Sequence, residues 1–212
     1  MAALARELGA NCHSLVLDVR RRSAVENAIG TLPDSHAGID VLVNNAGLAL
    51  GFGPAQAADP DDWDTMVDTN IKGLLYCTRT VLPAMVERDR GHVINVGSIG
   101  GYYPYPNGNV YGATKSFVQH FSLILRADLL GKNVRVTCVD PGLAETEFSE
   151  VRFRGDALKA AEIYRNITPL SGADVADGIY YVATLPRHVN INVLEMMPVM
   201  QAFSGPAFSR VQ

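Results

Sequence analysis

The sequence predicts an α/β protein with a doubly wound parallel sheet. Its strand-like runs are short and continuously apolar, which is typical of strands that are buried on both faces. Helical patterns separate these runs, so strand and helix alternate along the chain. The 212 residues, of which 48% are hydrophobic, contain no repeat or low-complexity linker, so we expect one domain over residues 1–212.

The first half of the chain is expected to contain two of the strands. In chain order the pattern predicts the end of a helix at 1–9, a strand at 13–19, a helix at 23–32, a strand at 39–47 and a long helix at 63–88. Gly9 is the expected stop of the first helix. Pro83 predicts that the long helix is divided into two pieces, because proline removes a backbone donor.

The second half is expected to supply three more strands. The predicted elements are strands at 92–98, 134–142 and 190–198 and helices at 110–130 and 174–185. The helix at 110–130 carries a large apolar residue at every fourth position from Phe117 to Leu129, which marks its buried face.

Polar and glycine residues close four of the five strands. These residues are Asp18, Asn44 to Gly47, Ser98, and Pro141 with Gly142. Ligands of such sheets bind beyond the carboxyl ends of the strands, so the four segments are expected to form one site.

The charge and cysteine patterns exclude several classes of function. A net charge of −4 with scattered Lys and Arg gives no basic surface, so neither nucleic acid nor a membrane is an expected partner. Cys12, Cys77 and Cys138 stand apart in apolar stretches, and no histidine falls at ligand spacing, so we expect no disulfide and no metal site. No apolar run approaches the roughly 20 residues of a membrane span, and a cytoplasmic location is expected.

Tyr111 and Lys115 form the strongest chemical signal. They are four positions apart in a predicted helix, which puts both side chains on one face. A lysine cation at that distance is expected to lower the tyrosine pKa by roughly 1 to 3 units from its reference near 10. Ser98 ends a strand thirteen positions earlier, where its hydroxyl could bind the same substrate oxygen as the tyrosine. Asn70 is a further polar group inside a helical run.

Taken together, these motifs resemble the short-chain dehydrogenase/reductase family over nearly the whole chain. The match consists of NNAG at 44–47, Asn70, Ser98, the Tyr111-x-x-x-Lys115 motif, and Pro141-Gly142 followed by Thr146. The resemblance implies a Rossmann-like fold in which Tyr111 exchanges a proton with a substrate hydroxyl or carbonyl oxygen while hydride passes to or from a nicotinamide. It also implies that Ser98 holds that oxygen, that Lys115 binds the nicotinamide ribose, and that Asn70 supports a water linked to Lys115.

The same resemblance assigns the cofactor-binding residues. It implies contacts to the adenine, the ribose and the nicotinamide from Asp18, Val19, Asn45, Ala46, Gly47, Tyr111, Lys115, Pro141, Gly142, Leu143 and Thr146.

Longer stretches, such as NNAGLALG and VRVTCVDPGLAETEFSEVRFRGD, are similar to a subgroup of NADP-dependent 3-hydroxy acid dehydrogenases. The subgroup implies NADP rather than NAD, a homotetramer, and substrates such as serine, allo-threonine, 3-hydroxypropionate or malonic semialdehyde. A small acid needs a cationic partner, for which Arg152 and Arg154 are the candidates.

One family feature has no counterpart in the sequence. The glycine-rich TGxxxGxG turn, which binds the pyrophosphate at a helix N-terminus, does not occur, so we expect a fold that lacks the first β-α-β unit. We therefore expect an N-terminally truncated chain, explained by a wrong start assignment or an incomplete sequence. Expressed alone, it is expected to bind NADP weakly or not at all, and either to aggregate or to depend on association.

Two alternative functions remain open. A hydrolase could use Ser98 as its nucleophile, although the glycine that such an elbow needs two positions before the serine is Val96 here. The chain could also be a non-catalytic remnant that acts only through subunit association.

Overall fold

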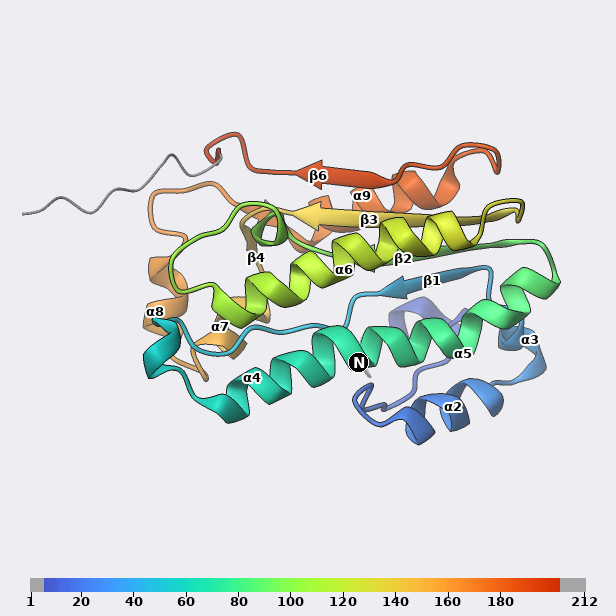
Figure 1. Ribbon diagram of the computed structural model, residues 1–212, viewed down its shortest axis with the longest axis horizontal. Helices are drawn as coiled ribbons and strands as arrows, with labels where there is room; N and C mark the ends of the chain where they lie inside the picture. The colour runs from blue at the N-terminus through green and yellow to red at the C-terminus, as the bar shows by residue number, and fades with distance from the viewer. Residues whose placement is uncertain (1–5, 203–212) are drawn as a thin grey trace, which may run out of the picture.

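The computed structural model describes residues 6–202 and has a parallel sheet between helices (Figure 1). The sheet has the order β1-β2-β3-β6, and every neighbouring pair is parallel. Its strands are β1 (Val41–Asn44), β2 (Gly91–Val96), β3 (Val134–Pro141) and β6 (Val193–Met196). The predicted α/β class and four of the five expected strands are therefore confirmed.

The fifth expected strand, at 13–19, is wrong. Residues 12–18 have no regular secondary structure, and Val16 is fully exposed. A strand is defined by hydrogen bonds to a neighbouring strand, and no described strand of the sheet lies beside this segment. Its apolar composition alone therefore does not make it a strand.

The helices among the described residues are α2 (Arg22–Gly30), α3 (Asp34–Ala37), α4 (Pro60–Val67), α5 (Leu74–Glu87), α6 (Asn109–Asp128), α7 (Glu147–Arg152), α8 (Ala157–Glu162) and α9 (Gly172–Thr184). Three of them, α5, α6 and α9, cover the faces of the sheet. In Figure 1, α5 and α6 lie on one face of the sheet and α9 on the other.

Short elements complete the fold. They are the 3-10 turns η1 (Gly9–Asn11), η2 (Ala55–Ala57) and η4 (Ile99–Gly101), and a two-residue ladder between β4 (Ala144–Glu145) and β5 (Leu170–Ser171). Gly9, the expected helix stop, has a left-handed φ of 65°. No helix in residues 6–202 combines the length and apolar composition that crossing a bilayer requires.

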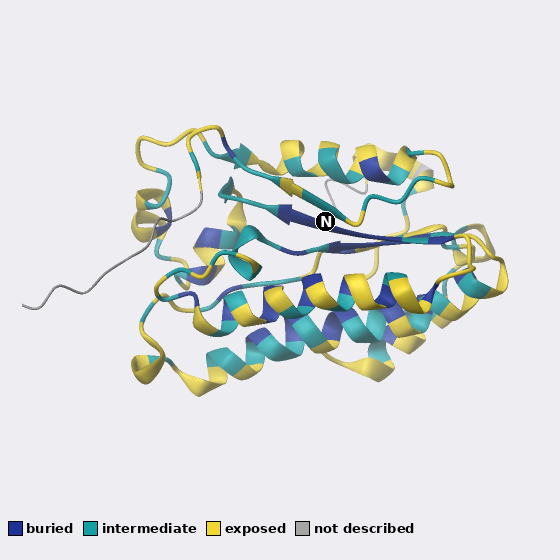
Figure 2. Ribbon diagram, turned by 45° about the horizontal axis from the view of Figure 1, so that its top comes forward, coloured by how far each residue is buried: buried dark blue, intermediate teal, exposed yellow. Residues whose placement is uncertain are grey.

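The core follows the predicted apolar patterns. Figure 2 shows β2 and β3 as the most buried strands, while the helices are buried only where they face the sheet. On the α5 and α6 side, one cluster joins Met85 of α5, Val93 of β2 and Leu125 of α6. On the other side, Val182 of α9 packs against Ile94 and Val139. This rigid centre holds the carboxyl ends of the strands in place.

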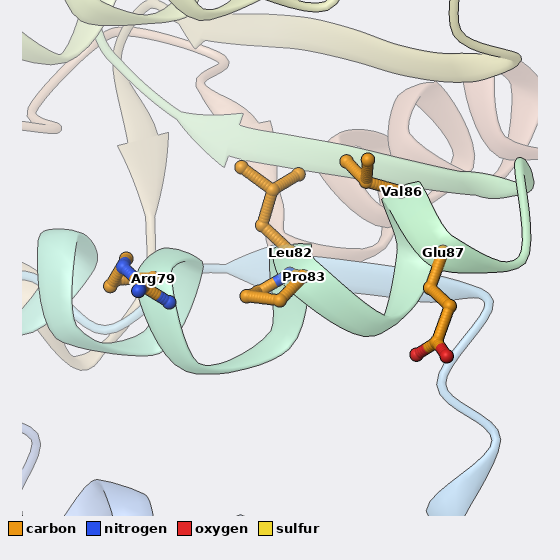
Figure 3. A pocket seen from close by; sticks show the side chains of 5 residues that line it. All are labelled: Arg79, Leu82, Pro83, Val86 and Glu87. Atoms are coloured by element: carbon orange, nitrogen blue, oxygen red, sulfur yellow. The ribbon is translucent and has the colours of Figure 1, made fainter.

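The long helix predicted at 63–88 is interrupted, but not at Pro83. A π-helical segment, η3 (Asp68–Gly73), separates α4 from α5, and Pro83 lies inside α5. The proline is tolerated because it and Arg79, whose carbonyl loses its usual partner, both lie on the exposed side of α5, where water can bind. Arg79, Leu82, Pro83, Val86 and Glu87 line a cavity of about 450 Å³ there, and none of them is a predicted site residue (Figure 3).

Candidate active site

The predicted catalytic side chains meet at the carboxyl ends of β1 and β2. Tyr111 and Lys115 lie on the first two turns of α6, Ser98 follows β2, and Asn70 belongs to η3. The arrows in Figure 1 point toward this end of the sheet, where α7 also lies. The four side chains thus come from three segments at the same rim of the sheet, as the strand-end pattern predicts.

Tyr111 is buried in an aromatic and cationic environment. Its ring lies 5.5 Å from the Phe148 ring and 5.5 Å from the Arg152 guanidinium carbon, and the Lys115 Nζ is 5.9 Å from the ring centroid. Burial raises the pKa of Tyr111 to about 12, against an opposing hydrogen bond with Ser98. The expectation of a lowered tyrosine pKa is therefore wrong for this structure, because the loss of water outweighs the Ser98 hydrogen bond and the charge of Arg152.

Lys115 is also buried, and its ammonium points to the end of β2. Nζ donates a hydrogen bond of 2.8 Å to the Val96 carbonyl, and the side chain is only 7% exposed. Burial lowers the pKa of Lys115 to about 8, so the cation is still the main form at neutral pH. A Cβ on Gly47 would lie 3.4 Å from this Nζ, so the loop after β1 passes directly beside the lysine.

Ser98 has extended backbone geometry rather than a strained elbow. Its φ is −173° and ψ is 150°, and its Oγ accepts a hydrogen bond of 3.1 Å from the Gly100 amide at the start of η4. The Gln119 amide holds the Ser98 carbonyl at 2.7 Å. A nucleophile elbow needs a sharp, strained turn, so this geometry does not support the hydrolase alternative.

Asn70 fastens the loop after β1. Its Oδ1 accepts from the Leu48 amide at 2.9 Å, while its Nδ2 donates to the Leu48 carbonyl at 2.8 Å and to the Thr114 hydroxyl at 3.0 Å. A Cβ on Gly47 would come within 3.3 Å of Asn70 Oδ1. Asn70 therefore joins η3, the NNAG loop and α6 at one buried point.

The predicted cofactor residues of the first half of the chain differ in their contacts. Asp18 is half-buried and paired with Arg20 at 2.9 Å, and hydrogen bonds from Arg20 lower the pKa of Asp18 to about 2. Val19 packs so closely on Gly73 that a Cβ on that glycine would lie 2.7 Å from it. Asn45 and Ala46 lead from β1 into the loop at Gly47.

Hydrogen bonds hold the segment that follows β3. The Gly142 amide donates to the Met196 carbonyl at 2.7 Å, and the Leu143 amide donates to Gln201 Oε1 at 2.8 Å. Thr146 caps α7 by accepting from the Phe148 amide at 3.2 Å. Pro141 through Thr146 thus lead from the end of β3 directly into the helix that carries Arg152.

The structure separates the two arginine candidates. Arg152 is only 9% exposed; its Nη2 donates to the Tyr105 hydroxyl at 3.2 Å, and its guanidinium lies 4.9 Å from the Phe52 ring centroid. Arg154 is exposed and ion-paired with Asp62 at 2.7 Å. Of the two, Arg152 is the one whose guanidinium lies over the Tyr111 ring.

Sequence reasoning missed the buried acid beneath the site. Asp140, at the end of β3, is fully buried, and its Oδ2 has no hydrogen-bond partner among the described residues. Burial raises the pKa of this carboxyl, while Gln119, Cys138 and the Ser98 backbone oppose the rise. The missed signal is a charged residue in the otherwise apolar run VTCVD. Tyr105, which directs Arg152, carries no comparable signal in the sequence.

Comparison with known proteins identifies the family. The family model described as short chain dehydrogenase matches residues 1–156. The chain belongs to the short-chain dehydrogenase family. The family prediction from the NNAG, serine and YxxxK motifs is thereby confirmed, together with the Rossmann-like fold.

Several relatives of this short-chain dehydrogenase have names that agree in chemistry. The NADP-dependent 3-hydroxy acid dehydrogenase YdfG of Salmonella typhi is 57% identical over 211 residues, which are 99% of this chain and 85% of the relative. The serine 3-dehydrogenase of Agrobacterium fabrum is 49% identical over 97% of this chain and 82% of the relative.

Solved structures give the same result. A closed form of serine dehydrogenase complexed with NADP+ superposes with a TM-score of 0.98 at 55% identity, over 99% of this chain and 85% of that chain. The serine dehydrogenase of Escherichia coli superposes with a TM-score of 0.83 at 50% identity, over 95% and 83% of the two chains.

Proposed function

We propose that this protein is an NADP-dependent dehydrogenase that interconverts the hydroxyl and carbonyl groups of a small 3-hydroxy acid. The observation that carries the proposal is the placement of Arg152 beside Tyr111, which sets a carboxylate-binding cation next to the predicted acid/base. The names of the relatives, which include 3-hydroxy acid and serine dehydrogenases, support the same substrate class.

The loop after β1 fits a nucleotide sugar. Gly47 has no Cβ, and the space that a Cβ would occupy lies 3.3 Å from Asn70 Oδ1 and 3.4 Å from Lys115 Nζ. A ribose hydroxyl in that space would have an ammonium donor and an amide oxygen acceptor within reach. When bound, NADP supplies or accepts the hydride. We propose that it is held by Asp18, Val19, Asn45, Ala46, Gly47, Tyr111, Lys115, Pro141, Gly142, Leu143 and Thr146.

Tyr111 is proposed to move the proton. With its pKa raised to about 12, the phenol is protonated at neutral pH and can donate to a substrate carbonyl oxygen in the reductive direction. Ser98, which is hydrogen-bonded to Tyr111, would hold the same oxygen. Lys115 would stabilise the phenolate left after proton transfer and lower the tyrosine pKa once a bound ligand brings its ammonium closer. Asn70 is proposed to position this lysine through the Gly47 loop and a water molecule.

Arg152 is proposed to select small acids. Its guanidinium makes a long hydrogen bond of 3.4 Å to the Gly51 carbonyl and one to Tyr105, which leaves further donors for a carboxylate. Phe52, Tyr105 and Tyr111 surround it, so the neighbouring space suits a short substrate. Serine, allo-threonine and 3-hydroxypropionate are of this size.

We further propose that the protein works as a homotetramer in the cytoplasm. Leu123 and Ile124 of α6 are 42% and 48% exposed, as expected of a helix that contacts another subunit. The three cysteines are free thiols, which suits a reducing compartment.

The substrate proposal is tested by following NADPH formation with 3-hydroxypropionate and with 1,3-propanediol, which lacks the carboxylate. We expect the acid to be preferred by at least about tenfold in kcat/KM, and we expect Arg152→Gln to remove most of that preference. Arg90→Gln, which removes an arginine paired with Asp40 away from the site, is the control and should retain the preference. Equal turnover of acid and diol by the wild-type protein would contradict the proposal.

A further inference from the structure

Arg154 lies two residues after Arg152 but is held by a different element. Its Nη2 is 2.7 Å from Oδ1 and 2.8 Å from Oδ2 of Asp62, and 3.7 Å from Oδ2 of Asp59. Asp59 is the N-cap of α4 and Asp62 stands in its first turn. The Asp62 carboxylate therefore lies between the helix N-terminus and the guanidinium, both of which attract a negative charge.

This ion pair is less exposed than an ordinary surface pair. The Asp62 side chain is 14% exposed, whereas that of Arg154 is 63% exposed. A carboxylate that is mostly removed from water interacts more strongly with its partner, and salt screens it less. The pair can therefore restrain the backbone that carries Arg154.

That backbone needs a restraint. Arg154 has a φ of 55° and Gly155 a φ of 86°, and the left-handed region is unfavourable for a residue with a side chain such as arginine. The preceding residue, Phe153, is the C-cap of α7. A sharp change of chain direction thus directly follows Arg152.

The segment 152–155 lies against the loop 51–53. The Gly51 amide donates to the Arg152 carbonyl at 3.2 Å, and Arg152 Nε donates back to the Gly51 carbonyl at 3.4 Å. The rings of Phe52 and Phe153 meet edge to face at 6.4 Å. These contacts hold the backbone of Arg152 in position relative to the Tyr111 ring.

A cavity lies between the loop 51–53 and α4. Its volume is about 240 Å³, and its lining includes residues 50–53 together with Asp62 and Trp63 of α4. Direct packing between the loop and the helix is therefore incomplete. The ion pair between Arg154 and Asp62 connects the segment 152–155 to α4 directly.

We propose that Arg154 is a positioning residue whose ion pair with Asp62 holds the segment 152–155 against the loop 51–53 and so keeps Arg152 over Tyr111. The role of Arg152 as carboxylate partner rests on the proposed function, but the restraint itself does not. Arg154, a candidate substrate-binding residue by sequence, thereby acts through its neighbour.

Hydrogen exchange measured by mass spectrometry on the whole chain tests the restraint directly. In Arg154→Gln, peptides covering Gly51 and residues 152–155 are expected to exchange about two- to five-fold faster, because the pair no longer opposes local opening. Peptides of β2 and β3 should not change. The control is Arg90→Gln, which removes an arginine paired with Asp40 at 2.5 Å near the opposite ends of β1 and β2.

A charge-reversed pair separates this role from a general effect on folding. Asp62→Arg alone should accelerate exchange at the same peptides, and the double variant Asp62→Arg with Arg154→Asp should restore at least half of the protection. Unchanged exchange at Gly51 in Arg154→Gln overturns the inference. Faster exchange throughout β2 and β3 overturns it too, because a positioning role is local.

Turnover gives a second, independent result. With 3-hydroxypropionate and NADP+, Arg154→Gln is expected to raise KM about two- to five-fold and to change kcat by less than about two-fold. A fall in kcat without a rise in KM contradicts the positioning role. If the wild-type protein does not oxidise the acid, the proposed function fails, while the exchange result still decides the restraint.

Discussion

Burial, rather than the charge of a neighbour, sets the protonation of Tyr111 and Lys115. The i and i+4 spacing correctly predicts that the two side chains share a face of α6. It does not report how completely that face is covered, and the loss of water raises the pKa of Tyr111 to about 12 and lowers that of Lys115 to about 8. A protonated phenol beside a cation is a suitable proton donor, so the proposed roles survive the correction.

His92 illustrates the same effect away from the site. It is 2% exposed, its Nε2 pairs with the Thr137 hydroxyl at 2.8 Å, and its Nδ1 has no partner among the described residues. Burial, assisted by the charge of Arg135, lowers the pKa of His92 to about 3. Since the pKa in the unfolded chain is near 6.5, the unfolded state binds the proton first as the pH falls.

We therefore predict that stability falls below pH 6.5 by up to about 1.4 kcal/mol per pH unit through this group. His92→Gln, which cannot take up the proton, should show a flatter dependence. The measurement is urea unfolding at pH 5.5, 6.0, 6.5 and 7.5, where ordinary Asp and Glu carboxyl groups stay largely ionised. Parallel pH profiles for the two proteins would refute the assignment.

The π-helical segment η3 is the element that brings Asn70 into the site. A π turn adds a residue to the helix and so changes the direction of the side chains on either side of it. The sequence places Asn70 in a helical run correctly, and the structure adds the break that directs it to Leu48 and Thr114. Proline was the expected cause of a break, but Pro83 sits where water can satisfy the freed carbonyl.

Removing the Asn70 side chain should therefore damage the loop that it fastens. Asn70→Ala leaves the Leu48 amide and carbonyl without their partners, and we expect a loss of about 2 kcal/mol in the free energy of unfolding. Asn27→Ala, at an exposed position of α2, is the control and should cost less than about 0.5 kcal/mol. Urea unfolding measures both, and equal losses would show that Asn70 fastens nothing.

For the whole molecule, local pattern predicts the sheet better than it predicts contacts between distant segments. Runs of apolar residues located β1, β2, β3 and β6, and the central strands β2 and β3 are buried on both faces. The run at 13–19 has the same composition but no neighbouring strand among the described residues, and Val41 of β1 is 41% exposed at the sheet edge. Whether a segment joins a sheet depends on its neighbours as well as on its sequence.

In the candidate site, too, local motifs were predictable from the sequence and long-range contacts were not. Tyr111, Lys115, Ser98 and Asn70 lie in motifs and were found by spacing. The pairing of Arg154 with Asp62 spans 92 positions, and the unpaired oxygen of Asp140 appears only when β3 is packed under α6. Such long-range contacts leave no periodicity to read.

Tyr111→Phe tests the central claim most directly, because it removes only the hydroxyl and leaves the buried ring in place. In an assay of NADPH formation with 3-hydroxypropionate, we expect kcat to fall by about 10²- to 10⁴-fold while the urea unfolding midpoint stays nearly unchanged. Turnover within about threefold of the wild-type protein would contradict the assignment of Tyr111 as the acid/base.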